Sequence, residues 1–341
     1  KLFFSVLIIL FIFTIIISIM FGAVQISISD MISALNNQII GRQNTTINQN
    51  VFIQLRLPRV ILCSITGAIL SVSGVLMQGL FRNPIVEPGL VGTSSGAAFG
   101  ASIIFVISSS FSPEFKSQIG PLLVSLFAFL GGFLFTLFVY TVSQATNKNS
   151  LINLLLIGLA VNAIGLSGTG FMSYIARDPQ ARSITFWNLG TFSGSSWFQV
   201  YMLGSVFIFC MYFALKYSKS LNLLILGESE ADYLGVDTVN LKKKILLLNT
   251  IMVSIATSFV GIISFLGLIV PHLLRLLIKS DHKLLIPSSA ILGAIILLIA
   301  DLIARMLLAP AEIPIGILTS LVGAPIFIFL ILKRETIQFK N

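Results

Sequence analysis

Long apolar runs dominate this sequence and most constrain its fold, because a helix of about 20 apolar residues is long enough to cross a bilayer. Only 10% of the 341 residues are charged, whereas soluble domains average about 25%. The sequence therefore predicts an all-α integral membrane protein with a single transmembrane domain over residues 1–341. Ten spans are expected, at residues 2–24, 60–80, 89–108, 120–143, 151–172, 198–217, 244–262, 263–279, 285–308 and 314–333.

Two of these spans need a further argument. Residues 2–24 are read as a span and not as a signal peptide, because the apolar run is longer than a signal peptide needs and no clear cleavage site follows it. The seventh and eighth spans are separated at Gly261 and residues 264–267, which together fit a tight turn. The remaining segments are too short to fold as a soluble domain.

The distribution of basic residues predicts the orientation. Ten spans put both termini on one side, and with that side in the cytoplasm 14 of the 21 Lys and Arg residues face inward. Cytoplasmic loops of membrane proteins carry such an excess. We therefore expect a multi-pass protein of the bacterial cytoplasmic (inner) membrane with both termini in the cytoplasm. The net charge of +9 belongs to these loops, and no nucleic-acid partner is expected.

One long polar stretch, at residues 217–244, interrupts the apolar chain and is cytoplasmic in this orientation. A short amphipathic helix fits residues 221–234, and Gly235 would end it by adopting a positive φ. The stretch is either a solvated loop between two spans or a docking surface for a soluble partner. Its apolar side is expected to comprise Leu223, Leu226, Ala231 and Leu234.

The outer segment at residues 174–197 is too polar to span the membrane and too aromatic for a plain loop. Its aromatic residues fit a belt at the membrane interface. The alternative is a short re-entrant helix at the mouth of a path, since irregular backbone at membrane depth must face protein or water. The aromatic residues in question are Phe186, Trp187, Phe192 and Trp197.

Three arginines on the predicted outer side run against the charge distribution. Arg56 and Arg59 stand three residues apart in the motif LRLPRV and would share one helix face. Arg305 follows Asp301 by one turn in the ninth span, so an i, i+4 ion pair explains both residues at the least cost. Cys63 and Cys210 lie inside apolar runs, and their spacing indicates neither a disulfide framework nor a metal site.

Four motifs, in order along the chain, resemble the permease subunits of type II ABC importers, which take up iron–siderophores, heme and cobalamin. They are LRLPR at 55–59, NPxxxPGLxG at 83–92, GLIVPHLLR at 267–275, and PIG followed by GAPxFxxLL from Pro314 onward. The polar stretch fits as well, because Glu230-Ala231 followed by Gly235 matches the EA-xxx-G core of the family's coupling loop. The resemblance extends from about Arg56 to Arg334.

The resemblance implies a ten-helix subunit that works as a homodimer, with the path on the two-fold axis. It also implies two cytoplasmic ATPase subunits on the coupling loops, at Glu228, Glu230, Ala231 and Gly235. A substrate-binding protein would dock outside on Arg56, Arg59 and Arg305, although Asp301 competes for the last of these. The sequence has no GxxxxGK[ST] motif. The chain is therefore expected not to be an enzyme and to bind no cofactor or metal, with ATP and Mg on the partner ATPase.

The resemblance also bears on the substrate, because residues 177–187 look most like the heme permeases. An iron complex is expected, with heme favoured and a ferric siderophore or cobalamin as alternatives. The two histidines, His272 and His282, lie in the eighth span and in a cytoplasmic loop, so the path would not ligate iron. The residues expected to line it are Phe171, Met172, Tyr174, Arg177, Arg182, Phe186 and Trp187.

Two functions of other classes were weighed against import by an ABC transporter. An ion-coupled secondary transporter needs intramembrane carboxylates as coupling sites, and Asp301 is the one candidate well inside a predicted span. A membrane enzyme needs a cluster of His, Asp or Glu at one depth, and the sequence indicates none. Besides the protein partners, membrane lipid is expected around the spans.

Overall fold

The computed structural model describes residues 2–22, 24–42, 46–108, 111–112, 119–146, 151–278 and 280–338, and the regular structure within these ranges is helical. Seven helices are long and apolar enough to cross a membrane, and three shorter apolar helices accompany them. The all-α, ten-span prediction is therefore confirmed for the described residues. The ten helices are α1 (Leu2–Met20), α4 (Leu57–Phe81), α5 (Thr93–Ile107), α7 (Gly120–Thr146), α8 (Leu151–Ile175), α10 (Trp197–Lys216), α13 (Thr238–Val260), α14 (Leu266–Ile278), α15 (His282–Met306) and α16 (Ile315–Gln338).

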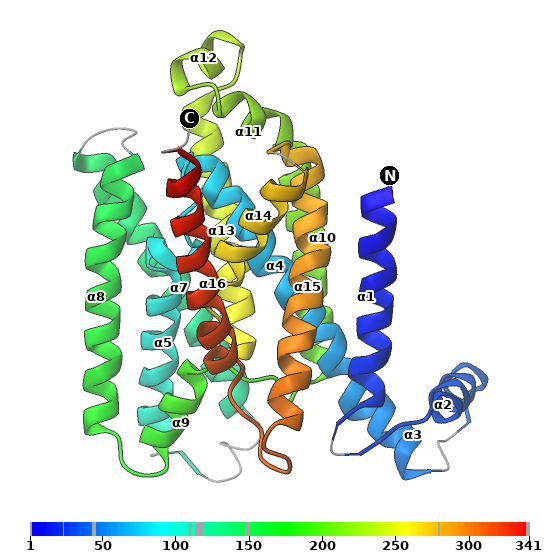
Figure 1. Ribbon diagram of the computed structural model, residues 1–341. Coiled ribbons are helices and arrows are strands. Elements are labelled where there is room, and N and C mark those ends of the chain that lie inside the picture. The colour runs from blue at the N-terminus through cyan, green and yellow to red at the C-terminus, as the bar shows by residue number, and fades with distance from the viewer. Residues whose placement is uncertain are drawn as a thin grey trace.

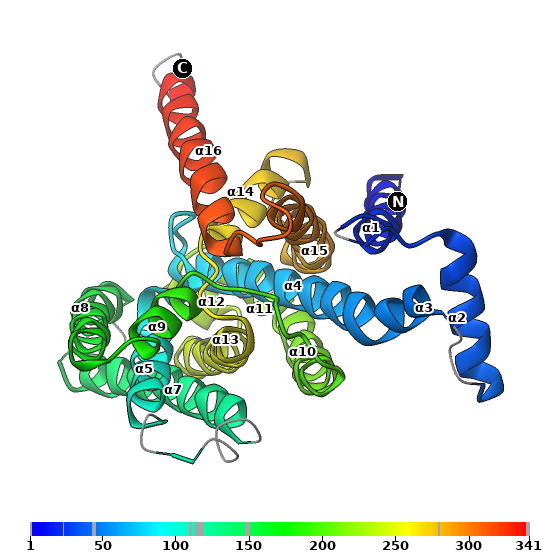
Figure 2. The same ribbon diagram turned by 90° about the horizontal axis from the view of Figure 1, so that it is seen from below.

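Helix α4 is the central element of the bundle. It contacts α10, α13, α14 and α15, whereas α1 and α8 stand at opposite edges (Figures 1 and 2). Two glycines allow this closeness. A Cβ at Gly67 would lie 2.4 Å from the carbonyl oxygen of Gly293, and one at Gly74 would lie 1.8 Å from that of Gly267. Small residues let helices approach closely in lipid, where no hydrophobic effect drives them together, and these two glycines serve this packing.

The turn between α13 and α14 lies where the sequence predicts it. Gly261 ends α13 with φ +77°, a conformation that glycine adopts readily. Phe265, just before α14, has φ +68°, and its main-chain N donates a hydrogen bond of 3.1 Å to Glu87 Oε1. Burial raises the pKa of this Glu87 carboxyl. The segment after α4, which includes the 3-10 turn η2 (Pro88–Val91), is thereby joined to the start of α14.

Short helices lie at the two ends of the bundle. One end carries α11 (Ser218–Leu224) and α12 (Glu228–Tyr233), together with the first residues of α1 and the last of α16; we call it the α12 end (Figure 1). The opposite end carries α2 (Ile28–Ile40), α3 (Ile47–Val51), the π-helical turn η1 (Phe52–Arg56) and α9 (Gln180–Asn188) (Figure 1). We call it the arginine end, because Arg56 lies there at the end of η1. The first and last described residues, 2 and 338, therefore lie on one side, as an even number of spans requires.

The prediction of one continuous helix over residues 221–234 is wrong. Gly227, with φ +138°, interrupts it and separates α11 from α12. A Cβ at Gly227 would lie 1.9 Å from Glu230 Oε2, so the Glu230 carboxylate occupies the space that a side chain would take. Gly235, with φ +86°, follows α12 and ends it as expected.

Candidate functional site: the α12 end and the arginine end

Ion contacts and hydrogen bonds fix α12 to the neighbouring spans. The Glu228 carboxylate accepts a hydrogen bond from Lys242 Nζ near the start of α13, and it lies 3.8 Å from Arg82 Nη2 at the end of α4. Asp232 accepts hydrogen bonds from the main-chain N and the hydroxyl of Thr238, at 3.2 and 2.8 Å. These contacts connect α12 to both α4 and α13.

The free side of α12 is partly apolar. Tyr233 is 91% exposed, and Leu226 and Leu234 are also exposed, whereas Ala231 is fully buried. The expected single apolar side with Leu226, Ala231 and Leu234 is wrong, because the break at Gly227 divides the segment and Ala231 is buried whereas the two leucines are exposed. Glu230 is exposed beside these apolar side chains. Exposed aromatic and aliphatic side chains that lie together are typical of a protein-binding surface.

A side-chain cluster that the sequence did not indicate joins α11 to α15. Asn222 Nδ2 donates to Asp281 Oδ1 at 2.7 Å, and Asn222 Oδ1 accepts from the main-chain N of His282 at 2.9 Å. The Asn222 hydrogen bond holds the pKa of Asp281 below its usual value. Asp281 also caps α15 by accepting from the main-chain N of Lys283. The α11–α12 unit is therefore attached to a third span.

Arg59 and Arg305 share one buried carboxylate at the arginine end. Asp301, 1% exposed, accepts hydrogen bonds from Arg59 Nε and Nη2 at 3.1 and 2.8 Å. Its Oδ2 lies 2.9 Å from Arg305 Nε, which confirms the predicted i, i+4 pair. Arg59 also donates to both oxygens of Glu312, at 2.8 and 2.9 Å. The sequence did not indicate that Arg59 takes part.

Arg56 and Arg305 tie the end of α1 to this cluster. Arg56 donates to the carbonyl oxygens of Phe21 and Val24, at 3.0 and 3.2 Å. Arg305 donates to Phe21 O and to the carbonyl and hydroxyl oxygens of Ser18, at 3.2, 3.0 and 2.9 Å. All three arginines therefore have partners within the chain. They also line a cavity of about 320 Å³, bordered by Glu312 and residues 192–195.

The expected path residues lie at the end of α8, in the link that follows it, and on α9. Phe171, Tyr174, Arg177, Arg182 and Phe186 are exposed. They form a surface with aromatic and cationic groups but, in the described part of the chain, no cluster of metal ligands.

The other two path residues are half-buried. They are Met172 and Trp187, and Trp187 packs against a small cluster comprising Ala97, Ala101 and Ala128.

The expected aromatic belt is wrong for one of its four members, because Phe192 is 2% exposed and packs within the protein. Trp197 is half-buried and donates its Nε1–H to Ile53 O at 3.2 Å. The alternative, a short helix, is present as α9.

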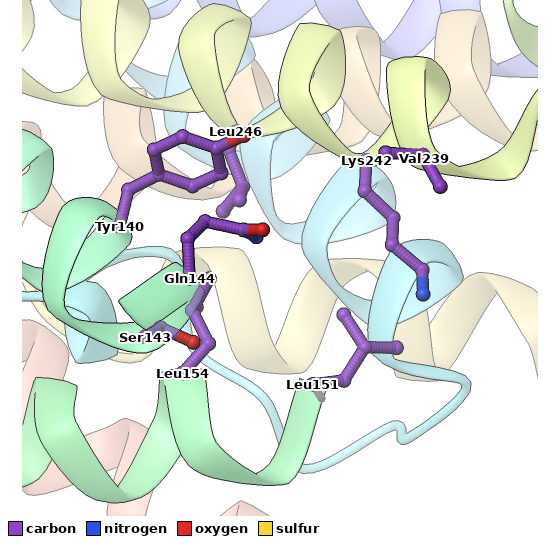
Figure 3. Close-up of a pocket in the computed structure, with 8 residues that line it drawn as sticks. All are labelled: Tyr140, Ser143, Gln144, Leu151, Leu154, Val239, Lys242 and Leu246. Carbon is purple, nitrogen blue, oxygen red and sulfur yellow. The ribbon is translucent and has the colours of Figure 1, made fainter. Parts of the chain in front are cut away.

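A further cavity lies near the α12 end, between α7, α8 and α13 (Figure 3). Its volume of about 10 Å³ is enough for about one water molecule. In Figure 3 the Lys242 side chain extends away from Tyr140 and Gln144, and its ammonium group binds Glu228. We therefore exclude this cavity as a substrate site. The cavity is lined by Tyr140, Ser143, Gln144, Leu151, Leu154, Val239, Lys242 and Leu246.

Comparison with known proteins supports a transport role. The model of the FecCD transport family matches residues 10–333. The hemin transport system permease protein HmuU of Yersinia pestis is 40% identical over 298 residues, which cover 86% of this chain and 87% of that protein. The vitamin B12 import system permease protein BtuC of Vibrio parahaemolyticus is 36% identical over 84% of each chain. A solved ABC transporter described as metal-chelate type and inward-facing matches with a TM-score of 0.83 and 34% identity, over 96% of this chain and 97% of that one.

Proposed function

Because the chain belongs to the FecCD transport family and is the membrane permease of an ABC importer, we propose that its substrate is an iron complex, with heme (hemin) favoured. As a permease it is not an enzyme, and ATP hydrolysis belongs to a separate subunit. The observation that carries the substrate proposal is the 40% identity to a hemin permease. It is supported by the exposed aromatic and basic residues at the end of α8 and on α9.

The heme route would pass between two copies of the chain. Heme has a broad apolar face, which Phe171, Tyr174 and Phe186 would contact as it enters. It also carries two propionates, and the exposed guanidinium groups of Arg177 and Arg182 are suited to bind carboxylates in a bidentate manner. The path would not ligate iron, since His282 is buried at the α12 end.

The alternative substrates are a ferric siderophore and cobalamin. The similarity to a vitamin B12 permease favours the second of these. Ion-coupled transport is disfavoured by the position of Asp301, because two arginines hold this carboxylate and a coupling site must exchange its ion.

The α12 end is the proposed ATPase-binding site and would face the cytoplasm, in agreement with the basic residues near it. Glu230, Tyr233 and Leu234 would contact the ATPase, while Glu228 and Ala231 hold α12 in position. The bonds of Glu228 to α4 and α13, and of Asn222 to α15, would carry the movement into the bundle. ATP binding shifts the permease between its two forms only if the ATPase binds those forms differently.

The arginine end is the proposed docking site for a substrate-binding protein. Arg56, Arg59 and Arg305 are satisfied internally, so an acidic side chain of the partner would have to compete with an existing acceptor. Glu312 is the acceptor most readily displaced, because 36% of its side chain is exposed whereas Asp301 is buried. Replacement of the Glu312 carboxylate by a carboxylate of the partner would change the free energy little, because Arg59 keeps one ion pair of the same kind.

The docking proposal is tested by Glu312→Gln, which removes the competing charge and leaves the arginines in place. We expect the affinity for the binding protein at low salt to rise about twofold to fivefold, the equivalent of one exposed ion pair of about 0.5–1 kcal/mol. The gain should vanish at high salt. Arg42→Gln, at an exposed position of the same end, serves as the control. Unchanged affinity in Glu312→Gln would contradict this role of Arg59.

The substrate proposal is tested by the double variant Arg177→Gln, Arg182→Gln in hemin uptake. Loss of two propionate contacts should raise the KM for hemin-loaded binding protein more than it lowers kcat. The same variant should transport cobalamin, which lacks propionates, as well as the unmodified protein does. A KM for hemin equal to that of the Arg42→Gln control would refute the proposed contacts.

A further inference from the structure

Helix α2 has an inverted distribution of polarity. Its polar side faces the protein, where Asp30 accepts a hydrogen bond from Asn48 Nδ2 at 3.3 Å and Ser33 accepts one from Gln49 Nε2 at 3.0 Å. On the same side, Ala34 is fully buried. Asp30 is the one ionised group in this helix. Its carboxylate accepts hydrogen bonds from Ser27 in the capping box and from Asn48 Nδ2.

The opposite side of α2 is an exposed aliphatic stripe. Ile28, Ile32, Leu35 and Ile39 follow the spacing i, i+4, i+7 and i+11, which places them along one line of a helix. Their exposed fractions range from 45% to 84%. At 100° per residue, this line is almost diametrically opposite Ser33 and Asn37. A helix on a water-soluble protein would have the reverse arrangement, so water is an unsuitable environment for this side.

The position of α2 indicates that lipid covers the aliphatic stripe. The helix lies beside the end of α1, on the side away from the main bundle (Figures 1 and 2). In the view along the spans, α3 lies between α2 and the bundle (Figure 2). The aliphatic stripe, which is opposite the side that binds α3, is therefore turned away from the bundle at the level where α1 ends. The outer surface of α1, which precedes α2 in the chain, is itself lipid-facing in a multi-pass membrane protein; its exposed residues include Leu2, Val6, Ile9, Phe13 and Ile16.

We propose that α2 is an interfacial helix whose aliphatic stripe is inserted among the lipid acyl chains of the leaflet at the arginine end. Such helices lie in the membrane plane with the apolar side in the headgroup–acyl boundary. The hydrogen bonds from α2 to α3 then connect the lipid surface to η1, which leads to Arg56. The helix thus supports the arginine end from the membrane. The inference requires only that the chain spans a membrane, so it stands or fails separately from the choice of substrate.

Spin-label accessibility in nanodiscs of the assembled transporter tests the inference. Labels would be attached to Ile32→Cys and Ile39→Cys in the stripe. Asn36→Cys is the matched control, because residue 36 is also exposed but lies about 70° around the helix from the stripe. The native cysteines, Cys63 and Cys210, are buried, and unsubstituted protein gives the background. We expect the labels at 32 and 39 to be more accessible to oxygen and less accessible to a water-soluble nickel chelate than the label at 36.

Two outcomes would overturn the inference. In one, the nickel chelate reaches all three labels equally, which means that the stripe lies in water. In the other, protection from nickel requires addition of the binding protein, or labels at 32 on two subunits lie within about 20 Å of each other, which means that a protein covers the stripe. A doxyl-lipid quenching measurement on fluorophores at the same positions gives a second readout that does not depend on label mobility.

Discussion

Substitution of Asp301 by Asn is the sharpest test of the charge cluster at the arginine end. Asp301→Asn preserves the size and shape of the side chain but removes the charge. The guanidinium groups of Arg59 and Arg305, whose side chains are 12% and 4% exposed, would then face each other with less compensation. Breaking a buried pair by removal of one partner costs about 3–5 kcal/mol.

Thermal unfolding of the purified protein in detergent measures this cost. At about 2 °C for each kcal/mol in a large chain, the apparent Tm should fall by about 6–10 °C. Glu312→Gln is the matched control, because it removes the second carboxylate on Arg59 from a side chain that is 36% exposed. Exposed pairs contribute about 0–1 kcal/mol, so this variant should lose about 2 °C or less.

The comparison between the two variants decides whether burial sets the strength of these pairs. Equal shifts in Tm for Asp301→Asn and Glu312→Gln would refute the reasoning, and so would a stabilised Asp301→Asn protein. Recovery of Tm at high salt in Asp301→Asn alone would indicate that the two arginines are less buried than the structure shows.

Two further predictions concern packing and coupling. Gly74→Val should prevent the close approach of α4 to α14, so that no folded protein is recovered by size-exclusion chromatography. Gly204→Ala should be tolerated, because the new Cβ would meet only Ile65 Cδ1 at 3.6 Å. Tyr233→Ser with Leu234→Ser should weaken ATPase binding at least tenfold and leave the Tm of the isolated permease within about 1 °C, since both side chains are exposed; full ATPase binding by this variant would contradict the proposed site.

The spans could be predicted from the sequence because bilayer thickness fixes the length of each apolar run. Local chemistry also located the turn at Gly261 and the end of α12 at Gly235, where a positive φ favours glycine. The i, i+4 pair of Asp301 and Arg305 followed from helical spacing alone.

The remaining features depend on contacts that local patterns do not encode. Arg59 and Asp301 are separated by 242 positions, so their pairing follows only from the packing of α4 on α15. The break at Gly227 was missed because a glycine in a polar segment fits both a loop and a tolerated helix position. Because of this break, Leu226 and Leu234 do not share one side with the buried Ala231.

One further element is encoded in the local sequence pattern. The spacing of apolar residues between 28 and 39 predicts an amphipathic helix, although the sequence alone does not say that its polar side faces the protein. That reversal is visible only from the hydrogen bonds to α3.

The proposed function is import of heme by this permease when its partner hydrolyses ATP. The most direct test is uptake by proteoliposomes that contain the permease, its ATPase and its binding protein, with hemin, a ferric siderophore and cobalamin supplied in parallel. We expect accumulation of hemin that requires internal ATP and persists in the presence of a protonophore. Accumulation of cobalamin or the siderophore in preference to hemin would contradict the proposed substrate, and uptake without ATP would contradict the mechanism.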